Sequence, residues 1–367
     1  FGYPLAHEDD AQRAARAGLG IVDAVGKLDT RLRREQGLRL SVRVGIHTGQ
    51  VVVGEMGEGP RREELALGDT PNIAARMQGI AEPDTLVISD ATHRLIRGFF
   101  DCRDLGAHAL KGVSRPIPVY RVLHESTARS RLDVAATTGL TPLVGRDQEV
   151  ALLLERWQRV VGGIGQVVWL SGEAGIGKSR LVQVLKEHVA RDPQAWLTEC
   201  CGSPYHKDSA FFPVIDLFER VILRFERQDS AREKLSKLEG FLVQYGFSLP
   251  EVVPLFAALL SVPLGEGYSA LHLTPTRQKQ KTMAALLSVL LARAAKQPVL
   301  FVVEDLHWID PSTRELLDLI LDQGPTARIL TVLTFRPEFQ PPWALSSHLT
   351  PMALGPLPQQ QTRVMVA

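Results

Sequence analysis

Residues 166–179 read QVVWLSGEAGIGKS, an apolar run that enters a glycine-rich turn and continues as the amphipathic stretch KSRLVQVLKEHV. The turn fits the pattern G-x-x-x-x-G-K-[ST], in which glycines let backbone N–H groups surround the phosphates of a nucleotide. The lysine of this pattern reaches the terminal phosphates, and the hydroxyl after it is a ligand for Mg²⁺. We therefore predict an ATP-binding loop made by Gly172, Gly175, Gly177, Lys178 and Ser179.

A second apolar run, LFVVED at residues 300–305, ends in the adjacent carboxylates Glu304 and Asp305. Beside a phosphate loop, one such carboxylate holds Mg²⁺ and the other orients the attacking water. We assign Ser179 and Glu304 to Mg²⁺, and the order Glu-Asp leaves open which carboxylate has which role. Arg336 follows the run ILTVLTF, where an arginine can contact the γ-phosphate of ATP or form a surface ion pair.

The part of the chain that contains these motifs alternates strand-like and helical stretches. Strand-like runs lie at residues 166–170, 195–200, 299–303 and 328–334, and an amphipathic helix is expected at 146–160. Strands that alternate with helices predict a parallel α/β sheet. We expect a P-loop NTPase domain over residues 142–367.

The first part of the chain has a different pattern. We expect helices at residues 9–35 and near 90–97, and short strands at 40–46, 50–54, 85–89 and 117–122. The strands at 40–46 and 50–54 are expected to be joined by a tight turn at HTG. Thr70-Pro71 is expected to start another helix, with Thr70 as its N-cap and Pro71 as its first residue. Residues 1–123 thus read as an α+β unit, and the polar stretch 124–141 reads as a linker.

Composition excludes several classes of protein. The 367 residues carry 42 Lys and Arg against 41 Asp and Glu, a net charge of +1 that gives no support for nucleic-acid binding. No apolar run approaches the roughly 20 residues that a membrane-spanning helix needs. The three cysteines, Cys102, Cys200 and Cys201, do not form a disulfide framework, and we expect them to be small buried side chains. The N-terminus does not resemble a signal peptide. It also lacks an initiator Met, and we expect a fragment of a longer cytoplasmic protein.

The second unit resembles a known family of ATPases. The stretches TPLVGRDQEVALLLERW, GEAGIGKSRL, LFVVEDLHWIDPSTRELL and LTFRPEF occur in the order typical of STAND-class signal-transduction ATPases, which are related to the AAA proteins. This resemblance covers residues 141–367. It implies a nucleotide-gated switch that hydrolyses ATP slowly.

The first unit resembles the catalytic domain of class III nucleotidyl cyclases. The stretches that carry the resemblance are FGYPLAHEDDAQRAARAGL, RVGIHTGQVVVGEMG, LGDTPNIAARMQ and HALKGVSRPIPVYRV. The resemblance implies a partial ferredoxin-like α+β domain that works as a homodimer. It also implies that Asn72 positions the ribose, Arg76 stabilises the pentavalent phosphorus transition state and Lys111 binds the triphosphate. Asn72 and Arg76 stand four residues apart and so share one helix face. His47, in the HTG turn, is interpreted as structural.

Two departures from the cyclase pattern concern metals and base selection. The two aspartates that bind Mg²⁺ or Mn²⁺ in the family precede the FGYP stretch and are not among these residues. A base-selecting position, seven residues before Asn72, holds Leu65, which cannot hydrogen-bond to a purine. The choice between ATP and GTP therefore stays open. We favour ATP, and cyclic AMP over cyclic GMP as the product, because the cyclase–ATPase fusions that this chain resembles are usually called adenylate cyclases.

Two other functions stay open at this point. One is an ATP-gated switch or scaffold whose cyclase-like domain is catalytically inactive, which Leu65 favours and the presence of Asn72, Arg76 and Lys111 opposes. The other is a transcriptional regulator, which requires a helix-turn-helix beyond residue 367 and finds no support in the charge balance. The favoured hypothesis is a cyclase whose output is controlled by the fused ATPase.

Overall fold

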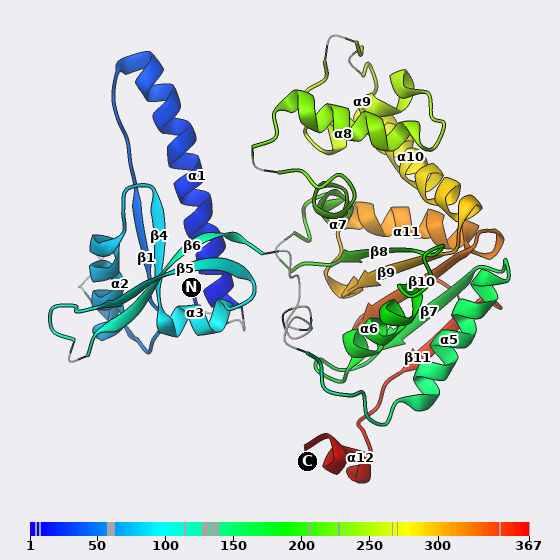
Figure 1. Cartoon of the computed structure of the whole chain (residues 1–367), viewed down its shortest axis with the longest axis horizontal. Coiled ribbons are helices and arrows are strands. Elements are labelled where there is room, and N and C mark those ends of the chain that lie inside the picture. Colours follow the sequence, from blue (N-terminus) through cyan, green and yellow to red (C-terminus); the bar gives the residue numbers. More distant parts are fainter. Residues whose placement is uncertain are drawn as a thin grey trace. The chain divides into compact units, whose positions relative to one another are not determined.

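The structure is a computed structural model. It describes residues 1–3, 6, 9–56, 63–113, 115–126, 132, 134, 139–204, 206–226, 228–265, 267–269, 271–344 and 346–366. The chain divides into two compact units, Phe1–Leu140 and Thr141–Ala367 (Figure 1). Much of the stretch expected to be a linker, 124–141, lies outside the described residues.

The first unit is an α+β domain. Its elements are α1 (Asp10–Gln36), β1 (Arg43–Ile46), β2 (Val52–Met56), β3 (Glu63–Leu67), α2 (Asp69–Ile80), β4 (Thr85–Ser89), α3 (Asp90–Ile96), β5 (Phe100–His108) and β6 (Ile117–Glu125). Four strands form one mixed sheet in the order β1-β4-β6-β5, in which β1 and β4 are parallel and the other neighbours are antiparallel.

Both faces of this sheet are covered (Figure 1). On one face, Leu86 and Ile88 of β4 pack with Ala15 of α1 and Ile96 of α3. On the other face, Val87 packs with Met77 of α2, as the alternation of side chains along a strand requires. The helix α2, which carries two predicted site residues, is therefore fixed against the sheet by a small core of its own.

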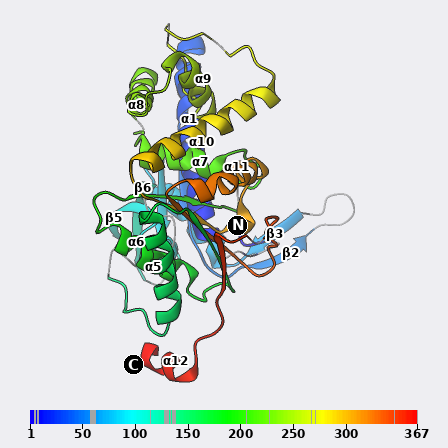
Figure 2. The same ribbon diagram turned by 90° about the vertical axis from the view of Figure 1, so that its right-hand side faces the viewer.

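The expected pairing of residues 40–46 with 50–54 is wrong. β1 pairs with β4, whereas β2 pairs with β3 in a separate two-stranded ribbon that Figure 2 shows. Gly45 explains the position of β1, because a Cβ atom there would lie 2.4 Å from the backbone nitrogen of Gln78 in α2. Alternating side chains indicate that a segment is a strand but do not indicate which strand it pairs with. The sequence pattern also did not predict β3 or β5.

The start of α2 also differs from the expectation. The helix begins at Asp69 with Gly68 at the N-cap position, and Thr70 is not the cap. The Thr70 hydroxyl instead donates a hydrogen bond of 2.7 Å to the carbonyl of Gln50, which ties the helix to the loop before β2. Pro71 is the third helical residue, still within the first turn, where the missing N–H costs no hydrogen bond.

The second unit is an α/β domain. Its elements are α5 (Asp147–Val161), β7 (Gln166–Ser171), α6 (Lys178–Val189), β8 (Trp196–Cys201), α7 (Phe212–Asp216), the π-helical turn η1 (Leu217–Ile222), α8 (Ala231–Val243), α9 (Leu249–Leu259), α10 (Pro275–Lys296), β9 (Val299–Glu304), the 3₁₀ turn η2 (Leu306–Trp308), α11 (Pro311–Gln323), the 3₁₀ turn η3 (Gly324–Thr326), β10 (Ile329–Phe335), β11 (Leu349–Ala353) and α12 (Gln359–Val366).

Its five strands form an all-parallel sheet in the order β11-β7-β10-β9-β8, which confirms the predicted parallel α/β fold. Alternate residues of β7 face opposite cores. Val168 and Leu170 pack with α5 and α6, whereas Val167 and Trp169 belong to the larger core that includes α10 and α11. Figure 1 shows these two helical layers on either side of the sheet. Within the described residues, no helix is both long and apolar enough to cross a membrane.

Candidate nucleotide sites

The phosphate loop of the second unit lies between β7 and α6. Gly175 and Gly177 have φ angles of 77° and 106°, in the left-handed region that favours glycine. A Cβ atom at either position would meet no atom within 4 Å, so backbone conformation, not space, requires these glycines. Gly172 is different, because a Cβ atom there would lie 2.9 Å from Ile176. The loop therefore has the backbone form that exposes successive N–H groups to an anion.

Lys178 is held inside this loop. Its side chain is buried, and Nζ donates hydrogen bonds of 2.7 Å to the carbonyl of Gly172 and 2.9 Å to that of Glu173. Burial lowers the pKa of Lys178, and the nearby Asp305 carboxylate opposes that shift. The loop carbonyls thus hold the ammonium group next to the place where the phosphates of a nucleotide would bind.

Ser179 and Glu304 are in direct contact. The Ser179 hydroxyl donates a hydrogen bond of 3.1 Å to Oε2 of Glu304, the last residue of β9. Glu304 is only 7% exposed. Burial, followed by the neighbouring carboxylates of Glu199 and Asp305, raises the pKa of Glu304 to about 7. A hydroxyl and a buried carboxylate that converge among other carboxylates fit the oxygen ligands that Mg²⁺ prefers.

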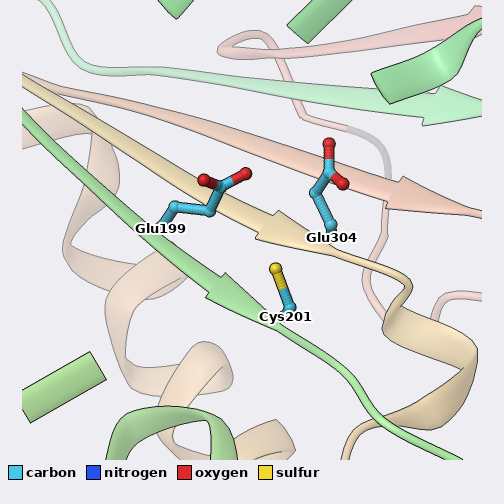
Figure 3. A group of neighbouring side chains, drawn as sticks. All are labelled: Glu199, Cys201 and Glu304. Carbon is cyan, nitrogen blue, oxygen red and sulfur yellow. The ribbon is translucent and has the colours of Figure 1, made fainter. Parts of the chain in front are cut away.

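Two further side chains point toward Glu304 from the neighbouring strand (Figure 3). One ligand atom each of Glu199, Cys201 and Glu304 lie within 4.8 Å of one another. The register of β8 and β9 causes this, because Cys201 is directly opposite Glu304 and Glu199 lies two residues earlier on the same face of β8. Lys186 of α6 forms an ion pair of 2.7 Å with Glu199.

Asp305 and Arg336 lie at the same edge of the sheet. Asp305 has a φ angle of 56°, and its N–H donates a hydrogen bond of 3.1 Å to the Thr334 hydroxyl of β10. Burial raises the pKa of Asp305, and the charges of Lys178 and Arg336 act against this shift. Arg336 makes no ion pair within 4.0 Å to any described residue, and its guanidinium lies 6.0 Å from the ring centre of Trp308.

In the first unit, Asn72 and Arg76 lie one turn apart on α2. Asn72 is exposed, and its Nδ2 donates a hydrogen bond of 3.2 Å to the carbonyl of Gly68. Arg76 is half-buried. The turn after β5 lies against this helix, because Leu110 packs in the same core as Met77.

That turn brings Lys111 toward Arg76. Gly112 has a φ angle of 74°, and a Cβ atom on it would lie 3.6 Å from Nη1 and Nη2 of Arg76. The side chain of Lys111 is exposed beside this contact. The three residues predicted for the first unit therefore lie on α2 and on the turn that packs against it.

Two other predicted positions have different outcomes. His47 accepts or donates a hydrogen bond of 2.7 Å between Nδ1 and the hydroxyl of Ser89, the N-cap of α3. Burial lowers the pKa of His47, which favours a neutral imidazole that holds two elements together. The backbone of Leu65 pairs with Gly54 in the β2–β3 ribbon, and its side chain lies outside the described part of the chain.

The two compact units of the chain match two different protein families. Residues 142–332 match the AAA ATPase domain family, and residues 1–124 match the adenylate and guanylate cyclase catalytic domain family. This chain belongs to the AAA ATPases and also carries a class III cyclase catalytic domain.

Individual relatives cover one or both domains. An uncharacterized protein of Rhizobium meliloti is 31% identical over the whole chain, which spans 35% of that protein. Rabbit adenylate cyclase type 10 is 23% identical over 95% of this chain, which spans 21% of that enzyme. The crystal structure of the adenylyl cyclase CyaB from P. aeruginosa is 31% identical over 35% of this chain and 66% of its own, with a TM-score of 0.32. The chain thus spans about a third or less of the two relatives it matches along most of its length.

Sequence reasoning missed several neighbours of the ATPase site. Glu199 and Cys201 lie beside Glu304, whereas the sequence predicts no role for Glu199 and only a small buried side chain for Cys201, which is half-buried. Their alternation along β8 is a usable signal, since residues i and i+2 of a strand share a face. The register that places them opposite Glu304 could not be read from the sequence. His307 and Trp308, which follow Asp305 in the 3₁₀ turn η2, were also missed.

Proposed function

We propose that this chain is the cyclase and switch region of a signalling enzyme that converts ATP to cyclic AMP and pyrophosphate. In the reaction, the ribose 3′-hydroxyl attacks the α-phosphate and pyrophosphate leaves. Asn72 orients the ribose, Arg76 stabilises the charge that develops on phosphorus, and Lys111 binds the triphosphate. The observation that carries this proposal is the close approach of Gly112, next to Lys111, to the guanidinium of Arg76, where a Cβ atom on Gly112 would lie 3.6 Å from Nη1 and Nη2.

The two domains differ in which of their residues would hold a metal ion. In the cyclase domain, no residue of this chain is assigned to Mg²⁺ or Mn²⁺, and the ions, held by the family's aspartates, would neutralise charge on the reacting oxygens. In the ATPase domain, Ser179 and Glu304 are the residues that would hold Mg²⁺ with ATP, and the hydrogen bond between them supports this assignment. Gly172, Gly175, Gly177 and Lys178 bind the phosphates, while Asp305 orients the attacking water and Arg336 contacts the γ-phosphate.

The ATPase domain regulates the cyclase in this proposal. ATP binding favours one arrangement of two cyclase domains, which form a homodimer, and a differential affinity of a few kcal/mol is enough to shift such an equilibrium. The protein is expected to act in the cytoplasm without nucleic-acid or membrane partners. The alternative, an ATP-gated scaffold with an inactive cyclase-like domain, is favoured by Leu65 at a base-selecting position.

The test is cyclic nucleotide formation by the protein expressed from its complete gene. Arg76→Ala is expected to lower the rate at least roughly 100-fold, the loss typical of removing one transition-state charge contact. Arg94→Ala is the matched control, because Arg94 only pairs with Asp90 on the surface of α3. A wild-type protein that binds ATP and forms no cyclic nucleotide would support the scaffold instead.

A further inference from the structure

The 3₁₀ turn η2 presents His307 at the carboxyl edge of the parallel sheet of the ATPase domain. The turn directly follows Asp305, and the Trp308 N–H donates a hydrogen bond of 2.8 Å to the Asp305 carbonyl. The position of His307 is thus fixed by the same segment that carries Glu304 and Asp305. This edge is where the phosphate loop opens.

Both ring nitrogens of His307 are buried, and neither has a hydrogen-bond partner among the described residues. Buried polar atoms nearly always have a partner in folded proteins, so each exception calls for an explanation. A histidine that only filled space could be replaced there by an apolar side chain of similar size. Among the described residues, the imidazole therefore keeps its hydrogen-bonding capacity available for a bound ligand.

The surroundings of His307 are strongly cationic. Lys178, Arg336 and Lys207 all act on its ring, and Glu338 opposes them. The carboxylate of Asp305 also lies near Lys178 and Arg336. Burial, reinforced by these cations, lowers the pKa of His307 to about 4. At neutral pH the ring is therefore uncharged, with one nitrogen that donates and one that accepts a hydrogen bond.

Trp308 holds two of these cations at the site. Lys207 lies 4.0 Å from the centre of the Trp308 ring and Arg336 lies 6.0 Å from it. Cations at these distances are attracted to the ring face. Two positive groups, Lys207 and Arg336, and a buried N–H donor therefore lie near Lys178, the lysine of the phosphate loop. A doubly charged phosphate group is a ligand class that satisfies all of them.

We propose that His307 contacts the terminal phosphate of the bound nucleotide and so makes the ATPase domain distinguish a nucleoside triphosphate from a diphosphate. This inference rests on the ATP-binding function proposed above and adds a residue to it. The neutral ring donates one hydrogen bond to a γ-phosphate oxygen. Because a diphosphate lacks that group, His307 contributes to the affinity for ATP alone.

The test is a pair of titrations of the whole chain in Mg²⁺ buffer, one with ADP and one with the non-hydrolysable ATP analogue AMP-PNP. His307→Ala is expected to weaken AMP-PNP binding about tenfold, the effect of one lost hydrogen bond to a charged group. The ADP affinity is expected to stay within about twofold. His307→Gln, whose amide also donates a hydrogen bond, is expected to recover part of the AMP-PNP affinity.

A matched control is His348→Ala. His348 precedes β11, and its carbonyl accepts a hydrogen bond from the N–H of Val167. Val167 lies at the N-terminal end of β7, whereas the phosphate loop follows the C-terminal end of that strand. Its loss should leave both affinities unchanged. Equal weakening of ADP and AMP-PNP by His307→Ala and His307→Gln would overturn the proposal, as would unchanged AMP-PNP affinity. A wild-type chain that binds neither nucleotide would overturn the proposed ATP-binding function as well.

Discussion

The Ser179 hydroxyl donates a hydrogen bond of 3.1 Å to Glu304, although 125 residues separate the two in sequence. The all-parallel sheet explains the contact, because β7 and β9 both flank β10 and end at the same edge. The phosphate loop follows one strand and the paired carboxylates end the other. Without metal, burial near other carboxylates favours the protonated form of Glu304. Binding of Mg²⁺ would instead require its ionised form.

Replacement of Glu304 by Gln should make the stability difference from wild type depend on pH. The folded-state pKa of Glu304 is raised from 4.5 to about 7, so the folded protein binds this proton more tightly than the unfolded chain does. Wild-type stability is therefore lost as pH rises from about 4.5 to about 7, whereas Glu304→Gln lacks this loss. Without metal or nucleotide, the variant should be more stable by roughly 2–3 kcal/mol at pH 8 and nearly equal at pH 5.

Denaturant unfolding in the presence of EDTA measures this difference. The same variant should bind Mg²⁺ with ATP more weakly than wild type, because it lacks the carboxylate. A stability difference that stays constant from pH 5 to pH 8 would contradict the assignment of a raised pKa to Glu304.

Replacement of Lys178 by Met should weaken the binding of both ADP and AMP-PNP. Lys178 donates to loop carbonyls in the structure and is positioned to reach the phosphates. Loss of a charge-assisted hydrogen bond predicts a reduction of roughly 10- to 100-fold, which isothermal titration calorimetry can measure. Lys279→Met is the control, since Lys279 pairs with Glu315 on the surface. Wild-type affinity in Lys178→Met would rule out the phosphate-loop assignment.

Replacing Gly45 of β1 and Gly79 of α2 by alanine should change the stability of the cyclase domain in opposite directions. A Cβ atom on Gly45 would lie 2.4 Å from the backbone of α2, so Gly45→Ala should destabilise the cyclase domain by about 1–3 kcal/mol. Gly79, inside α2, has no atom within 4 Å of an added Cβ. Gly79→Ala should therefore stabilise the domain by about 0.5–1 kcal/mol. Equal effects of the two substitutions on urea unfolding would contradict the packing of β1 against α2.

Lys111 and Arg76 should have separable effects on cyclase kinetics. Lys111 is exposed in the turn that packs against α2 and is proposed to bind the triphosphate in both ground and transition states. Lys111→Ala should therefore mainly raise KM, by roughly tenfold, whereas Arg76→Ala should mainly lower kcat. Steady-state kinetics on the protein from its complete gene tests this. A lower kcat with unchanged KM in Lys111→Ala would reassign Lys111 to the transition state.

Local patterns predicted some features of this molecule and not others. The strand–loop–helix around Lys178 and the apolar run before Glu304 are continuous in sequence, so period and composition reveal them. The partners of strands are not local. The hairpin expected at HTG is two strands in different sheets, because Gly45 allows β1 to pack tightly against α2 while the ribbon of β2 and β3 stands apart.

The same limit applies to the site. Asn72 and Arg76 share a helix face by spacing alone, but the approach of Gly112 to Arg76 depends on how the turn after β5 packs. Likewise, Glu199 reaches Glu304 through strand register, and the unpartnered nitrogens of His307 become visible only once its surroundings are known. Motifs therefore indicated the candidate residues, and tertiary packing determined which additional side chains lie beside them.

The central claim is that nucleotide binding by the ATPase domain sets the output of the cyclase domain. The most direct test is the rate of cyclic AMP formation at saturating ATP by the protein from its complete gene, compared between wild type and Lys178→Met. We predict that wild type forms cyclic AMP and pyrophosphate, and that Lys178→Met forms them at least roughly fivefold more slowly, the lower limit of a typical allosteric coupling. Equal rates in the two proteins, or no cyclic nucleotide from wild type, would contradict the claim.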